Sequence, residues 1–108
     1  MKKEDAAKDL RNMMICIQKF RANIAEMWDG AFDDVLGKQW PWVFGDNCPL
    51  PALSKILDTY DRDGILAPMD YFNMMVVLHR FMPEVIPVFV MLGADVPPEP
   101  SLQKWEDD

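Results

Sequence analysis

The sequence predicts a small all-α protein: a single-domain helical bundle of about four helices, with an aromatic and proline-rich loop between the first and second helices. Three observations favour this class. Apolar residues recur at helical spacing over the first third of the chain, prolines and glycines divide the rest into short segments, and the one β-branched segment has no partner strand. At 108 residues, half of them hydrophobic, the chain has material for one core and is too short for two domains.

The first predicted helix runs from about Glu4 to Trp28. Its apolar residues recur in steps of three and four without a proline, which is typical of one buried face. The predicted stripe is Leu10, Met13, Ile17, Phe20, Ile24, Met27, Ala31 and Val35. Asp29-Gly30 is a stop signal, and residues 31–36 can add a further turn or two. Ile15 falls on the polar side, where the core cannot cover it.

Residues 38–51 are predicted to form an irregular loop, because three prolines and a glycine interrupt any repeating pattern. Trp40, Trp42 and Phe44 give this loop a large apolar area that must pack against something. The sequence leaves open whether these rings are buried in the core or exposed to a partner.

Three shorter helices are expected after the loop. One of about ten residues starts near Pro51 and ends at residues 61–64, with an inner face of Leu53, Ile56, Leu57 and Tyr60. The next, over residues 68–82, is apolar on almost every side and belongs at the centre of the bundle. Residues 85–92 are rich enough in β-branched side chains to form a strand, but the lack of a partner strand favours a short helix ending at Gly93.

Residues 1–93 are therefore predicted to form one helical domain, and residues 94–108 an extended, proline-rich acidic tail. Two cysteines, Cys16 and Cys48, are too few for a disulfide framework and suggest reduced thiols. No apolar signal segment follows the first residues, and charged residues and prolines interrupt the most apolar stretch. These features predict a cytoplasmic protein that does not bind a membrane.

The charge of the chain is unevenly distributed. There are 18 acidic residues against 11 lysines and arginines, for a net charge of −7. Residues 1–22 carry six bases and three acids, whereas the remaining residues carry five bases and fifteen acids. The basic end lacks interleaved aromatic residues, so we expect a solvated helix face and no direct nucleic-acid binding. The acidic remainder favours a protein partner with a basic or mixed surface.

Groups suited to catalysis are scarce. The chain has one histidine, one threonine and two serines, and His79 is predicted on a buried helix face. The adjacent carboxylates Asp33 and Asp34 would diverge on a helix and cannot act as an acid–base couple. No glycine-rich phosphate loop is present. We therefore expect neither enzymatic activity nor a cofactor.

Residues 59–70 partly resemble an EF-hand calcium loop, with Gly64 at the position of the sharp turn. The candidate ligands are Asp61, Asp63, the carbonyl of Ile65, and Asp70. Thr59 replaces the usual first aspartate, and Asp70 is shorter than the glutamate of the last position. The favoured interpretation is a polar turn that ends a helix, and a degenerate calcium-binding module is one of the alternatives.

Nine methionines and four tryptophans favour protein binding, because both residue types are common at adaptable contacts and hot spots. The leading hypothesis is a small acidic protein–protein interaction module, an inhibitor or adaptor whose apolar side chains are rimmed by acids. The candidate partner-binding residues are Trp40, Trp42, Phe44 and Trp105, with Asp29, Asp33, Asp34, Asp58, Asp61 and Asp63.

Two further interpretations remain open. The acids could stand in for phosphates, as in a nucleic-acid mimic of the kind that phages use to inhibit DNA- or RNA-binding enzymes. Alternatively, the broad apolar faces of the first and third predicted helices could make the chain a homodimer. The mimic predicts binding that weakens steeply with salt, whereas an interface centred on Trp42 or Trp105 should tolerate moderate salt.

Overall fold

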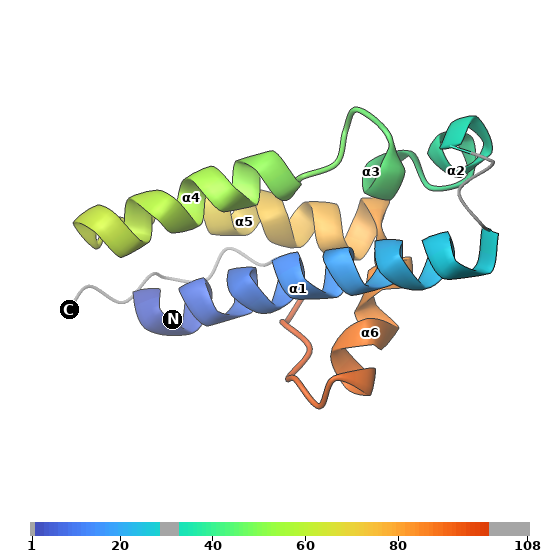
Figure 1. Ribbon diagram of the computed structural model, residues 1–108. Helices are drawn as coiled ribbons and strands as arrows, with labels where there is room; N and C mark the ends of the chain where they lie inside the picture. The colour runs from blue at the N-terminus through green and yellow to red at the C-terminus, as the bar shows by residue number, and fades with distance from the viewer. Residues whose placement is uncertain (1, 29–32, 100–108) are drawn as a thin grey trace.

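The computed structural model describes residues 2–28 and 33–99, and these residues contain helices and no strand (Figure 1). The all-α class is confirmed. The α-helices are α1 (Lys3–Trp28), α2 (Asp33–Gln39), α3 (Pro41–Phe44), α4 (Leu50–Asp63), α5 (Pro68–Val76) and α6 (Ile86–Met91). A π-helical segment, η1 (Val77–Phe81), continues α5, and a 3-10 turn, η2 (Pro83–Val85), leads into α6.

Helix α1 is the centre of the bundle, because α3, α4, α5, η2 and α6 all contact it. Figure 1 shows α4 above α1 and antiparallel to it, with α6 below. The predicted stripe supplies fully buried side chains at Leu10, Met13 and Ile17. They pack in one cluster with residues such as Leu53 of α4 and Phe89 of α6.

The predicted stripe on α1 is correct only over its first part. Phe20 and Ile24 are half-buried, and Met27 is 76% exposed, so its assignment to the core was wrong. The reason is visible in Figure 1, where the C-terminal end of α1 runs past α3 and α6 and has no helix beneath it. Ala31 and the side chain of Val35 lie outside the described residues.

The loop between the first and second predicted helices is present, but it is not irregular throughout. Pro41 opens the single helical turn of α3, where a missing N–H costs nothing because first-turn amides have no intrahelical partner. This turn buries Val43 completely. Gly45 ends it, and a Cβ there would lie 2.5 Å from the carbonyl oxygen of Pro41, so the site accepts only glycine without a shift.

Helix α4 has the predicted position and end, and its 14 residues are slightly more than expected. Gly64 terminates it in the left-handed conformation, with φ of 68°, and donates its N–H to the carbonyl of Tyr60 at 2.8 Å. Two contacts fasten this end to the start of α1: the Lys3 ammonium donates to the Gly64 carbonyl, and Arg11 pairs with Asp61.

The chain turns sharply between Phe81 and Pro83, and α6 follows as the predicted short helix, not a strand. Gly93 ends α6 with φ of 71°. Residues 94–99 have no regular structure, yet they return to the body, since Pro97 is buried and its carbonyl oxygen lies 3.0 Å from His79 Nε2.

Within the described residues, no single helix is long and apolar enough to cross a membrane. Two consecutive helical segments, Pro68–Phe81 and Pro83–Met91, are together long and apolar enough to cross one, but the chain bends by 89° between them. This pair also supplies much of the core, including Met75, Leu78 and Phe89.

Candidate functional site

The three aromatic residues of the loop attach it to the body of the protein. Trp40 meets Phe20 of α1 edge to face, with ring centroids 5.6 Å apart, and its ring centroid lies 6.2 Å from that of Phe44. Trp42 stacks on Phe81 at 4.6 Å. All three loop rings are half-buried and pack against the core. Each ring is therefore partly covered by the body of the protein and partly open to solvent.

Among the residues whose side chains are described, the longest run of exposed large apolar side chains lies at the end of α6. Val90, Met91 and Leu92 are consecutive and exposed, and Val96 is exposed shortly after them. We refer to these four residues as the α6 face. Met91, at 73% exposure, is among the most exposed large apolar residues described. In Figure 1 this helix projects below α1, which leaves its last turn open to solvent.

The sequence contained a signal for the α6 face that the prediction did not use. Residues 85–92 are apolar at every position. A helix of six residues on the surface of a small bundle can bury only one side, here through Val88 and Phe89. Of its remaining apolar side chains, Ile86 is partly buried against the core, and Val90 and Met91 are exposed.

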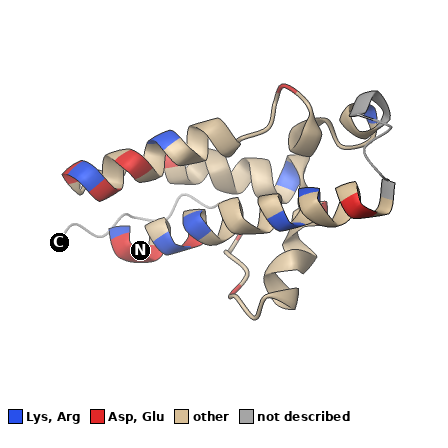
Figure 2. Cartoon of the chain, in the orientation of Figure 1, with Lys and Arg blue, Asp and Glu red and all other residues tan. Residues whose placement is uncertain are grey.

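The charged residues closest to α6 in the sequence, on its C-terminal side, are acidic. Between Phe81 and Glu99 the chain carries Glu84, Asp95 and Glu99 and no lysine or arginine. Asp95 and Glu99 are exposed, and Figure 2 shows α6 and the segment after it without basic residues. The α6 face thus combines exposed apolar side chains with exposed acids nearby in the sequence, a combination that was expected elsewhere, around the loop aromatics.

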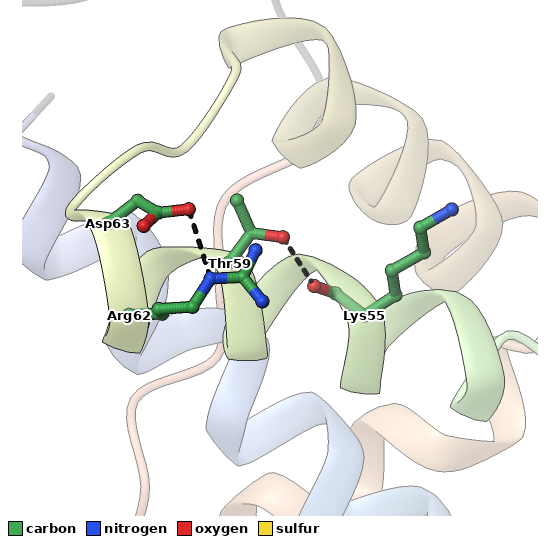
Figure 3. A network of polar contacts seen from close by, with 4 residues as sticks. All are labelled: Lys55, Thr59, Arg62 and Asp63. Atoms are coloured by element: carbon green, nitrogen blue, oxygen red, sulfur yellow. Dashed lines mark hydrogen bonds and ion pairs between the residues drawn. The ribbon is translucent and has the colours of Figure 1, made fainter.

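The predicted acidic clusters are only partly within the described residues. Asp29 and Trp105 lie outside them, and the side chains of Asp33 and Asp34 are not described. The second cluster, at the end of α4, is interleaved with bases. Asp58 is exposed, Asp61 pairs with Arg11, and Asp63 accepts a 3.2 Å hydrogen bond from Arg62 Nε (Figure 3). The charge that this cluster presents to solvent is therefore lower than its acids alone suggest.

The residues that resemble a calcium loop are not arranged as one. Thr59, Asp61 and Asp63 belong to α4, where residues two apart project about 200° apart around the helix axis. Thr59 Oγ1 donates to the backbone carbonyl of Lys55 at 3.0 Å (Figure 3). Ile65 and Asp70 follow beyond the end of the helix. No group of three or more His, Cys, Asp or Glu side chains in the described part of the chain could hold a metal ion.

A polar contact that the sequence did not reveal joins α1 to α5. Tyr71 donates its hydroxyl to Asp9 Oδ2 at 2.8 Å, and both side chains are partly or fully buried. Burial raises the pKa of Asp9, the hydrogen bond from Tyr71 lowers it, and the nearby Asp5 and Asp95 raise it further. Burial and the Asp9 carboxylate also raise the pKa of Tyr71. This pair links two helices and lies beside the segment that follows α6.

The other groups of chemical interest are held in unreactive settings. Burial raises the pKa of the Cys16 thiol to about 11, so the nucleophilic thiolate is scarce at neutral pH. Cys48 is a second free thiol, half-buried at the start of α4. His79 Nε2 donates to the Pro97 carbonyl and thereby positions residues 94–99.

Comparisons of the chain with protein-family models, with curated proteins and with solved structures find no match.

Proposed function

We propose that the protein is a small protein-interaction module, an inhibitor or adaptor, that docks through the α6 face. The observation that carries this proposal is the run Val90, Met91 and Leu92, exposed at the end of a helix instead of completing the core. Contiguous exposed apolar side chains cost solubility and mark sites that another surface covers. Methionine suits such a contact because its flexible thioether adapts to the partner.

The acids that follow α6 indicate the chemistry of the partner. Asp95 and Glu99 are exposed and follow the apolar run closely in the sequence, which offers no base beside them. A partner with apolar side chains surrounded by lysine or arginine is complementary to this arrangement, and its charges would speed association. A second copy of the chain fits less well, because the acids of the two copies would repel one another. A stable interface buries roughly 800 Å² on each side, so the α6 face would be its centre and not its whole extent.

A matched pair of substitutions tests this proposal. Met91 and Met27 are exposed to nearly the same extent, 73% and 76%, and both lie near the C-terminal end of a helix, where a lysine is well tolerated. Met91→Lys should abolish capture of the partner from an extract of the cells that make the protein, whereas Met27→Lys should retain it. Equal capture by the two variants would refute docking through the α6 face.

Measurements of competition, salt dependence and mass distinguish the alternatives. Partner binding that is competed by added DNA or RNA and falls steeply between low and moderate salt would instead favour nucleic-acid mimicry. Sedimentation at two protein concentrations tests the homodimer, for which the apparent mass must rise with concentration. The α6 face predicts moderate salt dependence, no competition by nucleic acid, and a mass that does not change.

A further inference from the structure

A hollow of about 410 Å³ lies between α4 and α5, on a different part of the surface from the α6 face. Its volume is within the roughly 300–1,000 Å³ of typical ligand sites. Its apolar lining includes Ile56 and Met74, which pack against the core from the two helices. Its polar lining consists of Lys55 and Thr59 on α4, and Asp70 and Asn73 on α5.

The hollow exists because α4 and α5 both pack on α1. Leu53 and Leu57 are the buried residues of α4, and Tyr71 and Met75 those of α5. At 100° per residue, Lys55 and Thr59 project from a different side of α4 than Leu53 and Leu57 do. Figure 3 shows Lys55 and Thr59 projecting together from α4. The two helices therefore carry a second, partly apolar seam in addition to the one that α1 covers.

A hollow with an apolar floor between two helices can accept the apolar face of a third helix. The charges beside this groove are opposite in sign, with Lys55 on one wall and Asp70 on the other. Among the described residues, neither side chain forms an ion pair. An occupant that carries an acid along one flank and a base along the other would pair with both walls. A uniformly acidic or basic occupant would be repelled by one of them.

We propose that this groove binds an amphipathic helix of a partner protein, with its apolar face on Ile56 and Met74 and with flanks of opposite charge. Figure 1 places α4 and α6 on opposite sides of α1, so a helix bound here would not compete with a partner on the α6 face. A chain with both sites holds two partner segments at once, which is the property of an adaptor. This inference does not depend on the α6 face.

The test uses the full chain and three synthetic helical peptides with the same leucine face. One peptide carries glutamates on one flank and lysines on the other, one carries only lysines, and one only glutamates. NMR spectra of the side-chain methyl groups report binding at Ile56 and Met74. We expect the mixed peptide to shift these two signals and to bind about two- to five-fold more tightly than either uniform peptide, the range for one exposed ion pair.

Charge variants of the walls sharpen the expectation. Lys55→Glu makes both walls acidic and should transfer the preference to the lysine peptide, whereas Asp70→Lys should transfer it to the glutamate peptide. Lys19→Glu, on the exposed face of α1, makes the same charge change as the first variant and should leave the preference unaltered. Melting curves verify that all three variants fold.

Several results would overturn the proposal. One is the absence of shifts at Ile56 and Met74 at millimolar peptide, and another is equal affinity for all three peptides. Shifts of the same signals when the concentration of the protein is raised without peptide would show that a second copy of the chain binds in the groove. Shifts of the Ile56 and Met74 signals on removal of residues 101–108 would show that the protein's own C-terminal segment occupies the groove. None of these results bears on the Met91→Lys experiment, so the two proposals fail separately.

Discussion

The hydrogen bond from Tyr71 to Asp9 should make the stability of the fold depend on pH in a way that two substitutions can isolate. The pair joins α1 to α5 across the centre of the bundle, at 2.8 Å between the two oxygens. A hydrogen bond to a charged group contributes about 1.5–3 kcal/mol when it is shielded from water. Because Asp9 is only half-buried, we expect about 1–2 kcal/mol for Tyr71→Phe at pH 7.

The sign of the pH dependence follows from the pKa of Asp9. Burial, the largest influence, raises that pKa above its ordinary value of 3.8, so the folded chain holds the proton more readily than the unfolded chain does. This group therefore adds stability below pH 3.8 that is lost as the pH rises through the higher folded pKa. Asp9→Asn keeps an oxygen that accepts the hydrogen bond but has no carboxyl group to titrate. The free energy of unfolding of this variant should therefore not show the pH dependence that Asp9 causes.

The assay is urea denaturation of the wild type, Tyr71→Phe, Asp9→Ala and the double variant, at pH 7 and at acid pH, with Asp9→Asn measured beside them for the pH slope. The double-mutant cycle isolates the coupling between the two side chains from any other contact of Tyr71, and we expect about 1 kcal/mol at pH 7. The coupling should shrink when Asp9 is protonated. Tyr60→Phe removes the same oxygen from the chain's other tyrosine and serves as the control. A coupling near zero at pH 7, or one that grows in acid, would refute this reasoning.

Three further predictions concern the fold. Gly64→Ala should lower the free energy of unfolding by about 1–2 kcal/mol, because an alanine resists the left-handed backbone at φ of 68°. Gly37→Ala, within α2 and with free space around it, should be neutral or stabilising. Thermal melts that show equal losses of stability for the two variants would contradict this. Phe89→Ala should lower the free energy of unfolding by about 3–5 kcal/mol, because the ring is fully buried between α6 and α1. A loss of less than about 1 kcal/mol in urea denaturation would show that the ring is not part of the core. With Cys48→Ser, the remaining thiol is Cys16, which is fully buried and whose pKa burial raises to about 11. It should therefore react with a thiol reagent at pH 8 only as fast as the protein opens, and reaction at the rate of an unfolded cysteine would contradict the burial.

The helices themselves could be predicted from local pattern. Helical spacing and the terminators Gly64 and Gly93 placed α1, α4 and α6 to within a few residues. The turn of α3 was missed because Pro41 was interpreted only as a helix breaker, although proline is also well suited to the first helical position. Met27 was misplaced because periodicity shows which side of a helix is apolar, but not how far the neighbouring helices extend along it.

The candidate site was less predictable, because it depends on how the helices pack. The sequence shows a basic first segment and an acidic remainder, but not that antiparallel packing joins Arg11 of α1 to Asp61 of α4, 50 residues away. It shows that residues 85–92 are apolar throughout, but not which of them the body leaves uncovered. Only the arrangement of α6 against α1 distinguishes the buried Phe89 from the exposed Met91.

The most direct test of the proposed function is the affinity of the captured partner for Met91→Lys, measured by titration beside the wild type and Met27→Lys. The α6 face predicts at least a ten-fold loss for Met91→Lys, equivalent to about 1.4 kcal/mol, and no more than a two-fold change for Met27→Lys. Wild-type affinity in Met91→Lys, or equal losses in the two variants, would contradict docking through the end of α6.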